Sequence, residues 1–320
     1  MISAAAAGCR IFDIIRGRRK DMLKDFSEIE AHLIESGIKK RIVLAGAQDD
    51  LALAALVRAK RKGFAQGILI GDEAKIRELL AGMEEPAEDY EIVNELREMT
   101  AARKAVKMVN EGKADLPMKG LMQTASFLMA VQNPFGGLLD EDGLLNEFTA
   151  FYWPEKDRIL ITGDCAINVA PTLEQKKIIA ANLIDLARSF KCSPVRVAAV
   201  SVLEKPNPDI QSTMDAHELA QMDWGPDVIF EGPFALDNAL DEEAARHKGI
   251  TGEVAGKADV LLMPDMHAGN VFHKCIHFFG HMPFASGTIG ARCPIIMNSR
   301  TDDEDAKYYS VMTGVLRASL

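Results

Sequence analysis

The chain has 320 residues, of which 48% are hydrophobic and 26% charged, and its formal net charge is −10. This length and composition are typical of a globular protein with two ordinary domains or one large one, whose core needs no disulfide or metal. The acidic balance argues against nucleic acid or an anionic membrane as a partner, so an anionic ligand has to be met by local basic residues.

The cysteines and the N-terminus indicate the compartment. Five cysteines occur without a CxxC pair, which is typical of reduced thiols in a cytoplasm. The start, MISAAAAGCRIF, places a cysteine after Ala-Ala-Gly as a lipoprotein signal does, but it lacks a basic beginning and a long apolar core. No apolar run approaches the length that spans a bilayer. We therefore expect a cytoplasmic protein with no membrane partner.

The first part of the chain alternates between strands and helices. A helix is predicted over 21–36, ending at Gly37. The following strands are predicted at 41–45, 67–70, 91–93 and 115–118, and the helices at 50–62, 72–81, 95–110 and 123–132. Because strands and helices of this length form parallel βαβ units, the pattern predicts a doubly wound sheet.

The pattern changes near Asn133–Gly137, where turn residues cluster. Two adjacent strands follow, at 147–153 and 157–162, and Pro154-Glu155-Lys156 between them indicates a hairpin. The alternation then resumes, with helices predicted at 172–190, 213–222, 237–248, 269–279 and 303–316 and strands at 196–202, 227–231, 259–263 and 294–297. The sequence thus predicts two α/β domains with a cleft between them.

The stretch from Pro294 to Asp305 has the form of a ligand site. A short apolar run breaks into Asn298-Ser299-Arg300 and then into an acid-rich helix start. In open α/β sheets, ligands bind beyond the carboxyl ends of the strands, where a hydroxyl, a guanidinium and carboxylates can act together. The alternative is that Ser299, Thr301 or Asp302 only caps the following helix. Taken alone, this stretch favours the capping interpretation.

A second strand end carries a possible phosphate site. Lys119 and Gly120 follow the strand at 115–118, and Thr124 lies at the start of the next helix. Gly120 permits close approach of the backbone, and free amides at a helix N-terminus bind anions. A simple turn between strand and helix is the alternative interpretation.

Polar turns with glycine follow three further strands. Their candidate ligand-binding residues are Asp164 and Asn168, then Glu231 and Gly232, then Asp265, Gly269 and Asn270. Each set alone could be turn chemistry. Because the carboxyl ends of parallel strands meet at one edge of a sheet, their recurrence favours a binding site.

Three other motifs were considered as nucleotide or metal sites, and the sequence argues against each. Gly252–Lys257 (GEVAGK) is one residue too short for a P-loop, and Ala258 stands where the magnesium-binding hydroxyl is needed. No GxGxxG follows a predicted strand. His273 and His277 have the four-residue spacing of zinc sites, but no acidic or cysteine ligand is placed to complete the set, so we expect no metal.

Several segments of the chain resemble the phosphate acetyl/butyryltransferase family. They are more similar to its butyryltransferase branch than to its acetyltransferase branch. The resemblance runs from about Lys40 to the C-terminus, and the segment around Gly249–Asn270 is its most specific part. The segments that carry it are RIVLAGAQDD, RAKRKGFAQGILIGDEAKI, GKADLPMKG, PTLEQK, EGPFALDNAL, AARHKGITGEVAGKADVLLMPDMHAGN and PIIMNSR.

The resemblance implies a two-domain α/β fold like that of isocitrate/isopropylmalate dehydrogenases, in a homodimer. It also implies that the C-terminal helix returns to the first domain, so that residues 1–137 plus 298–320 form the first domain and 138–297 the second. The implied reaction is acyl-CoA + phosphate = acyl phosphate + CoA, with a butyryl or similar group. Coenzyme A is then a substrate, and no metal or redox cofactor is needed.

The resemblance also implies roles for site residues. The family's Ser-Arg pair falls on Ser299 and Arg300, with the arginine stabilising developing negative charge and the serine contacting the thiol or the acyl group. The aspartate that acts as base in the acetyltransferase branch aligns with Ala306. This leaves Asp305, Asp302 and Asp303 as candidate bases.

Two other functions fit the same fold. One is a metal- and NAD-dependent decarboxylating dehydrogenase, which would need clustered aspartates and an arginine set that the sequence does not show. The other is a relative that binds CoA or an acyl phosphate without turnover.

Overall fold

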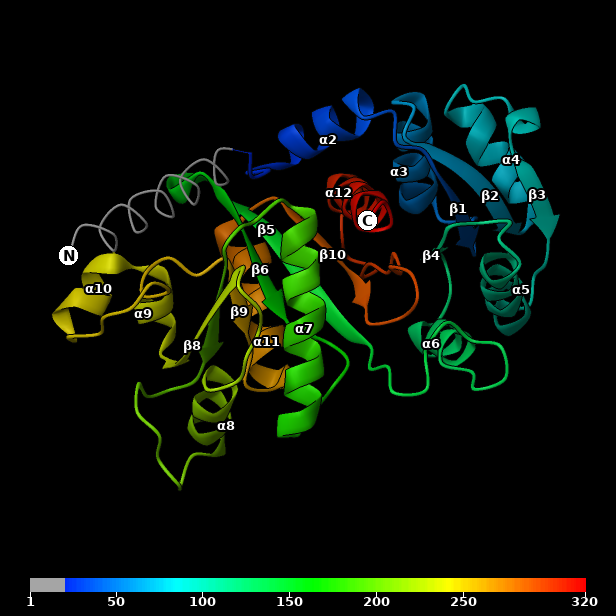
Figure 1. Cartoon of the computed structure of the whole chain (residues 1–320). Helices are drawn as coiled ribbons and strands as arrows, with labels where there is room; N and C mark the ends of the chain where they lie inside the picture. The colour runs from blue at the N-terminus through cyan, green and yellow to red at the C-terminus, as the bar shows by residue number, and fades with distance from the viewer. Residues whose placement is uncertain (1–20) are drawn as a thin grey trace. The chain divides into compact units, whose positions relative to one another are not determined.

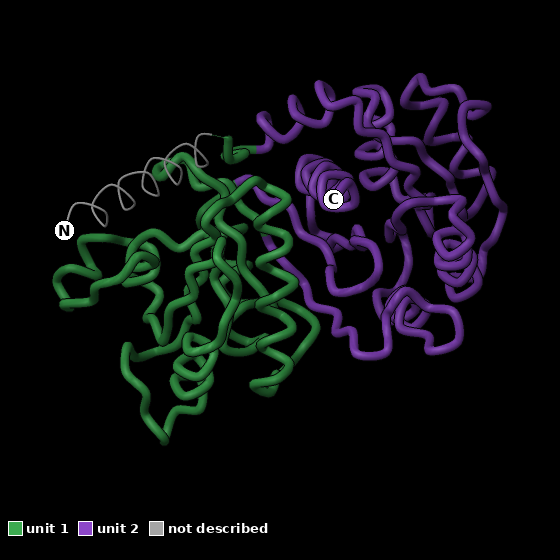
Figure 2. The backbone as a smooth tube through the Cα atoms, in the orientation of Figure 1, with its two compact units in different colours: residues 1–25, 150–282 green, residues 26–149, 283–320 purple. Residues whose placement is uncertain are grey.

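A computed structural model describes residues 21–320, which form two compact units (Figure 2). Of the described residues, unit 1 contains 21–25 and 150–282, and unit 2 contains 26–149 and 283–320. The cysteine at position 9 and the signal-like start of the chain lie outside the described residues. Within the described part, no helix is long and apolar enough to cross a membrane.

Unit 2 contains a parallel four-stranded sheet in the order β3-β2-β1-β4. Its register pairs Ala45 of β1 with Ile70 of β2 and with Lys119 of β4, so these strand ends lie at one edge. The strands are β1 (Lys40–Ala45), β2 (Ala65–Gly71), β3 (Glu91–Asn94) and β4 (Leu116–Lys119), each close to its predicted position. The apolar side chains of β1, β2 and β4 are almost completely buried, as expected for parallel strands covered by helices, whereas those of the edge strand β3 are half-buried.

The helices of unit 2 follow the predicted alternation (Figure 1). The terminal helix α12 contacts α3, and it packs on α2 through Tyr309, whose ring stacks on Phe26 with centroids 4.2 Å apart. Asp303 caps α12 by accepting a hydrogen bond from the Ala306 amide at 2.8 Å. The helices are α2 (Phe26–Glu35), α3 (Asp50–Arg61), α4 (Glu73–Gly82), the short η1 (Ala87–Asp89), α5 (Glu98–Asn110), α6 (Thr124–Val131) and α12 (Glu304–Arg317).

The second sheet has the order β10-β5-β6-β9-β7-β8, in which β6, β9, β7 and β8 run parallel to one another. Only four residues link β5 to β6, which is too short for a parallel crossover and confirms the predicted hairpin. The strands are β5 (Asn146–Trp153), β6 (Arg158–Gly163), β7 (Val195–Val200), β8 (Val228–Phe234), β9 (Val260–Leu262) and β10 (Phe284–Ile289).

The helices of unit 1 begin with α7, which has a complete capping box in which Thr172 and Gln175 bond each other's main-chain amides. These helices are α7 (Leu173–Ser189), α8 (Gln211–Ala220), α9 (Leu236–Leu240), α10 (Glu242–His247) and α11 (Met266–Cys275), together with the short η2 (Pro154–Lys156) and the π-helical η3 (Ile276–Gly280).

Two predicted elements are wrong in detail, and one strand was not predicted. The helix predicted at 237–248 is two helices, because Asp241 has an extended backbone and its side chain caps α10. The strand predicted at 294–297 is reduced to single bridges at Ile295 and Ile296. Strand β10 was not predicted, since its alanine, serine, glycine and threonine residues interrupt the apolar pattern.

The chain passes from one unit to the other between Asp25 and Phe26, inside β5 between Thr149 and Ala150, and between Met282 and Pro283. The sequence predicts domain limits at 137/138 and 297/298 instead. The turn cluster near Gly137 precedes β5, and the strand continues without interruption through the point where the units divide.

Candidate functional site

The turns that follow β1 and β4 pack directly against each other, and each contains a glycine, Gly46 after β1 and Gly120 after β4. The Gly120 amide donates to the Ala45 carbonyl at 2.8 Å, and the Leu121 amide donates to the Gly46 carbonyl at 2.8 Å. A Cβ on Gly120 would lie 2.3 Å from the Gly46 oxygen, and Gly46 itself has a φ of +75°. Only glycine therefore allows these turns, which fix the backbone on either side of Lys119.

The Ser299-Arg300 segment leaves the sheet at the same edge. The Lys119 amide donates to the Ile296 carbonyl at 2.9 Å, and the Ile296 amide donates to the Pro117 carbonyl at 3.0 Å. Ile296 thus extends the parallel sheet beyond β4 for one residue, and Asn298 to Arg300 follow as the strand-end turn. The structure brings the predicted Ser-Arg pair and the predicted phosphate turn together.

Both main-chain groups of Ser299 are bound, one by Lys307 of α12 and the other by Asp302, which precedes that helix. Lys307 donates from Nζ to the Ser299 carbonyl at 3.1 Å, and the Ser299 amide donates to Asp302 Oδ2 at 3.0 Å. The hydroxyl of Ser299 lies 3.0 Å from that of Thr301. Because its backbone is fixed at both groups, the exposed side chain of Ser299 starts from a defined position.

Asn298 anchors the same turn to the interior of unit 2. Its amide nitrogen lies 2.9 Å from Ser310 Oγ of α12 and 3.2 Å from Ser286 Oγ of β10. The buried Asp302 carboxylate accepts from the Ser299 amide through Oδ2, whereas its Oδ1 has no hydrogen-bond partner among residues 21–320. An unpartnered carboxylate oxygen is stable here only because basic groups lie around it.

Three basic residues, Lys119, Arg300 and Lys307, gather at this edge, and we call them the basic cluster. Lys119 and Lys307 are 6% and 4% exposed, whereas Arg300 is exposed and reaches the Met122 carbonyl only at 3.4 Å. None of the three forms an ion pair with a residue in the described part of the chain. Burial, and after it repulsion from Lys307, lowers the pKa of Lys119.

The acids near Lys119 do not balance this charge. Asp49, the N-cap of α3, and Asp302 are the two carboxylates whose fields raise the pKa of Lys119. Three cations against two carboxylates leave a positive excess, and Asp49 already accepts the Ala52 amide at 2.9 Å. Burying cations without counter-ions is costly, so this arrangement favours the binding of an anion.

The first turn of α6, which follows the Gly120 turn, adds hydrogen-bond donors. Thr124 is the exposed first residue of this helix, and no side chain caps the helix from Gln123. The first amides of a helix lack partners within it and attract anions. Thr124 lies four residues after Gly120, at the start of the helix that the sequence predicts.

The candidate bases occupy three different environments. Asp302 is 1% exposed and belongs to the turn that carries Ser299. Asp303 caps α12. The Asp305 side chain is 62% exposed and pairs with Arg58 at 2.7 Å, so the structure does not bring it among the charges around Lys119.

In unit 1, four of the predicted residues converge. The Asp164 carboxylate accepts from the amides of Ala166, Ile167 and Asn168 at 3.0, 3.1 and 2.7 Å and from the Asn168 side chain at 2.5 Å. Asn270 donates to the Cys165 carbonyl at 3.1 Å. A Cβ on Gly269 would lie 2.3 Å from the Asp164 carbonyl oxygen, so glycine lets α11 approach this turn.

The other predicted residues of unit 1 organise turns. Glu231 accepts from the amides of Glu253 and Val254 at 3.0 and 3.2 Å and thereby holds the segment that resembles a P-loop. Asp265 caps α11 through the Ala268 amide at 3.0 Å. Gly232 allows β8 to pass β7, since a Cβ there would lie 2.8 Å from that of Ala199. Substrate contact by these residues stays a prediction.

The two histidines do not share one turn of an α-helix. His273 is buried in α11, and His277 lies in the π-helical turn that follows. Burial, with a smaller effect from Lys274, lowers the pKa of His273 to about 4. Within residues 21–320, no group of three or more histidine, cysteine or acidic residues lies close enough to hold a metal ion.

Sequence reasoning missed Lys307 and Asp49. Lys307 shares a face of α12 with Ser310, Val311 and Gly314, all of which are buried. A lysine on an apolar stripe was the available signal, because such residues are rarely buried without a role. Asp49 follows the end of β1, where the strand-end rule applies as it does at β4.

The geometry defines an α/β protein with a positively charged strand edge, and comparisons identify its family. The family model described as "Phosphate acetyl/butaryl transferase" matches residues 83–314. The phosphate butyryltransferase of Clostridium acetobutylicum is 38% identical over 301 residues, which cover 93% of this chain and 99% of that protein. The phosphate acetyltransferase of Thermotoga maritima is 33% identical over 278 residues, covering 86% and 94%.

Solved structures share the fold. A branched-chain phosphotransacylase from Enterococcus faecalis V583 superposes with a TM-score of 0.78 at 24% identity, covering 87% of this chain and 99% of that one. A phosphotransacetylase from Streptococcus pyogenes also gives 0.78, at 21% identity and with 92% and 99% covered. The chain belongs to the phosphate acetyl/butyryltransferase family and is an acyltransferase.

Proposed function

We propose that this enzyme transfers a short acyl group reversibly between coenzyme A and inorganic phosphate, with butyryl or a similar chain as the group transferred. The basic cluster is the observation that carries the proposal. Lys119, Arg300 and Lys307 lie at one strand edge without ion-pair partners among the described residues, and a phosphate dianion supplies the charge they lack.

The reaction needs charge stabilisation more than covalent help from the protein. A phosphate oxygen attacks the thioester carbonyl, the C–O bond forms, and the C–S bond breaks to release the CoA thiolate. In the reverse direction the thiolate attacks the carbonyl of the acyl phosphate. Negative charge develops on the carbonyl oxygen in both directions, and Arg300 is the exposed cation of the cluster that can offset it.

Lys119 and Lys307 have a different role from Arg300 because they are buried. Their charges lower the free energy of phosphate at the strand edge, while the Gly120 turn and the start of α6 offer main-chain and hydroxyl donors, with Thr124 among them. Ser299 contacts the thiol or the acyl group from a backbone that Lys307 and Asp302 fix. Asp302 is in this account a positioning residue.

The remaining family expectations are proposals of the same kind. Coenzyme A acts as substrate, and the reaction proceeds without a metal or redox cofactor. The enzyme works as a homodimer in the cytoplasm, and its two domains have an architecture like that of isocitrate/isopropylmalate dehydrogenases. Activity that survives removal of divalent ions by a chelator supports the first point, and activity restored only by added metal contradicts it.

The direct test uses a panel of acetyl-, propionyl-, butyryl- and branched acyl-CoA with inorganic phosphate. A thiol reagent measures the CoA released. We expect phosphate-dependent release with a highest kcat/KM for a four-carbon chain, and comparison across the panel gives the acyl specificity. Tight CoA binding without release from any of these substrates would show a non-catalytic relative instead.

A further inference from the structure

One large apolar side chain is exposed at the strand edge that carries the basic cluster. Leu121 lies on the turn between β4 and α6, and it is 48% exposed. The other large apolar side chains within 119–124 and 296–302 are at most 9% exposed, and they belong to Met122, Ile296 and Met297. In these two segments, Leu121 therefore supplies the apolar surface that a substrate can reach.

The backbone of Leu121 is fixed by hydrogen bonds. Its amide donates to the Gly46 carbonyl at 2.8 Å, and the amide of Met122 donates to the Gly120 carbonyl at 2.9 Å. Met122 is 1% exposed, so this turn already contributes an apolar side chain to the core. A defined backbone thus holds the half-exposed side chain of Leu121 at the surface.

The sequence that begins at this turn is free of charge. A single exposed leucine is ordinary on a protein surface. This one belongs to a run without charged residues, from Gly120 to Leu139, although 26% of the chain is charged. The exposed residues of α6 within this run, among them Ala125 and Met129, are uncharged as well. An uncharged surface beside three cations suits a substrate that joins a hydrocarbon chain to an anionic group.

Arg300 connects this surface to the proposed chemistry. It donates from Nη2 to the carbonyl of Met122, the residue after Leu121, at 3.4 Å. In the proposed reaction Arg300 faces the carbonyl oxygen of the acyl group, and phosphate lies at the Gly120 turn. The acyl chain is bonded to the same carbonyl carbon, so it starts between these two groups. Leu121 lies on the segment that joins them.

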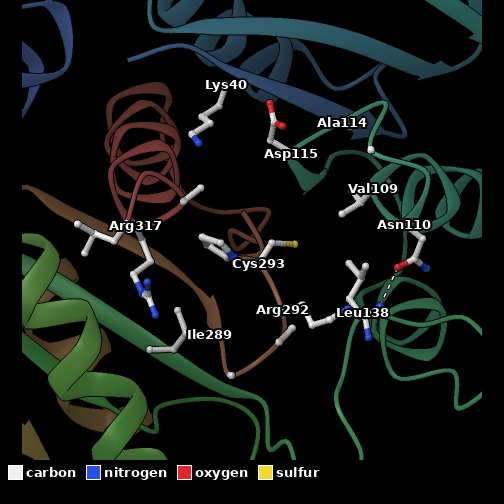
Figure 3. Close-up of a pocket in the computed structure, with 16 residues that line it drawn as sticks. Lys40, Val109, Asn110, Ala114, Asp115, Leu138, Ile289, Arg292, Cys293 and Arg317 are labelled. Atoms are coloured by element: carbon white, nitrogen blue, oxygen red, sulfur yellow. Dashed lines mark hydrogen bonds between the residues drawn. The ribbon is translucent and has the colours of Figure 1, made fainter. Parts of the chain in front are cut away.

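The cavity of unit 2 does not offer a surface for this chain. It has a volume of about 500 Å³ and lies at the amino ends of the strands, where Lys40 begins β1 and Asp115 precedes β4 (Figure 3). Its lining includes no residue of 119–124 or 296–302. The acyl chain therefore has to be received at the carboxyl ends of the strands, where the basic cluster lies.

We propose that Leu121 receives the acyl chain and thereby sets the preference for butyryl over acetyl groups, an assignment that rests on the proposed transfer between coenzyme A and phosphate. The carbons beyond the acetyl group cover the exposed side chain of Leu121. Removing their apolar surface from water stabilises the bound chain, and the effect grows with each methylene group. An acetyl group is too short to gain from this contact.

The test compares kcat/KM for butyryl-CoA and acetyl-CoA, each with saturating inorganic phosphate, in the wild type and in Leu121→Ala. We expect Leu121→Ala to lower the ratio of the two values by about 3- to 10-fold, because only the longer chain loses a contact. Leu121→Met keeps an apolar side chain of similar volume and should retain the ratio. An unchanged ratio in Leu121→Ala, including an equal loss with both substrates, overturns the assignment.

The matched control is Leu96→Ala. Leu96 follows β3 at the carboxyl end of the same sheet, and it is 68% exposed. Because β3 and β4 are the outer strands in the order β3-β2-β1-β4, Leu96 lies away from the basic cluster. Leu96→Ala should therefore keep the wild-type ratio. A change as large as that of Leu121→Ala would contradict a specific contact.

The same measurements separate this assignment from the proposed reaction. Phosphate-dependent release of CoA by the wild type, with the same ratio in Leu121→Ala, overturns only the role of Leu121. No release by the wild type from either substrate overturns the proposed reaction and the role of Leu121 with it.

Binding gives a second readout that needs no turnover. The thioethers S-butyl-CoA and S-ethyl-CoA carry a chain on sulfur without a carbonyl group, so they cannot transfer it to phosphate. Calorimetry should show that the wild type binds S-butyl-CoA about threefold or more tightly than S-ethyl-CoA, and that Leu121→Ala binds both equally. A wild type without this preference, or a preference that survives in Leu121→Ala, overturns the assignment.

Discussion

Lys307 donates a hydrogen bond from its Nζ to the carbonyl oxygen of Ser299 at 3.1 Å, across eight positions of the chain. This contact ties the turn that carries the Ser-Arg pair to the first half of α12. It also places a buried cation close enough to Lys119 to lower its pKa. One lysine therefore both fixes the geometry of the site and raises its positive charge.

Replacing Lys307 should separate these two effects. Lys307→Met removes the charge and the hydrogen bond, and we expect kcat to fall by about 10- to 100-fold and KM for phosphate to rise. Lys307→Arg keeps the charge and should recover part of both. Steady-state kinetics in phosphate give the values, with Lys107→Met on exposed α5 surface as control. Kinetics of Lys307→Met that match the wild type would remove Lys307 from the site.

Arg300 should matter for turnover and little for folding. Its side chain is exposed and makes one long contact, to the Met122 carbonyl at 3.4 Å. Arg300→Ala removes the cation proposed to face the developing oxyanion, so kcat should fall by about 10²- to 10³-fold with an unchanged unfolding transition. Arg77→Ala, which breaks only a surface pair with Glu73, is the control. Unaltered turnover would show that Arg300 takes no part in the reaction.

The candidate carboxylates can be told apart by isosteric substitutions. Asp302→Asn weakens the bond to the Ser299 amide and leaves the two buried lysines less compensated, so we expect at least a tenfold loss of kcat/KM. Asp305→Asn breaks an exposed pair with Arg58 and should change stability by at most about 1 kcal/mol, with turnover retained. The opposite order of effects would make Asp305 the functional acid.

Gly120 should tolerate no side chain. A Cβ there would lie 2.3 Å from the Gly46 oxygen, and the two strand ends would have to separate. We expect Gly120→Ala to lower the free energy of unfolding by roughly 2–4 kcal/mol. Gly82→Ala at the end of α4, where a Cβ meets nothing within 4 Å, should change it by less than about 0.5 kcal/mol. Urea titrations of both variants measure the difference, and equal midpoints would contradict the packing described.

Stability should depend on pH through His273. Its pKa in the folded protein, about 4, lies below the ordinary value of 6.5, so the unfolded chain takes up the proton first. The free energy of unfolding should therefore fall as the pH is lowered from 6.5 towards 4, by a few kcal/mol at most. His273→Gln should flatten this dependence, whereas the exposed His247→Gln should not. Urea titrations at several pH values decide, and parallel curves for all three proteins would refute the assignment.

Most of the fold could be predicted from the sequence because the strands of the parallel sheets are apolar runs bounded by turn residues. β10 could not, since small and polar residues fill it and the sheet supplies its stability. The division of the helix at Asp241 depends on a local cap that competes with helical periodicity.

The site was only partly predictable, because some of its residues follow strand ends and others reach it only through tertiary packing. Lys119, Gly120, Ser299 and Arg300 follow strand ends, and parallel strands place such residues at one edge. Lys307 reaches that edge from inside a helix, and only the packing of α12 shows it. Asp302 and Asp305 are close in sequence but differ in burial, because Asp302 belongs to the buried turn before α12 and Asp305 lies on the exposed side of its first turn.

The most direct test of the central claim is a measurement of both products from butyryl-CoA and inorganic phosphate. Free thiol reports CoA, and reaction with hydroxylamine reports the acyl phosphate. We expect equal amounts of the two products, formed only when phosphate is present, with Arg300→Ala strongly reduced. Release of CoA that does not depend on phosphate, or that leaves no acyl phosphate, would contradict acyl transfer to phosphate at this site.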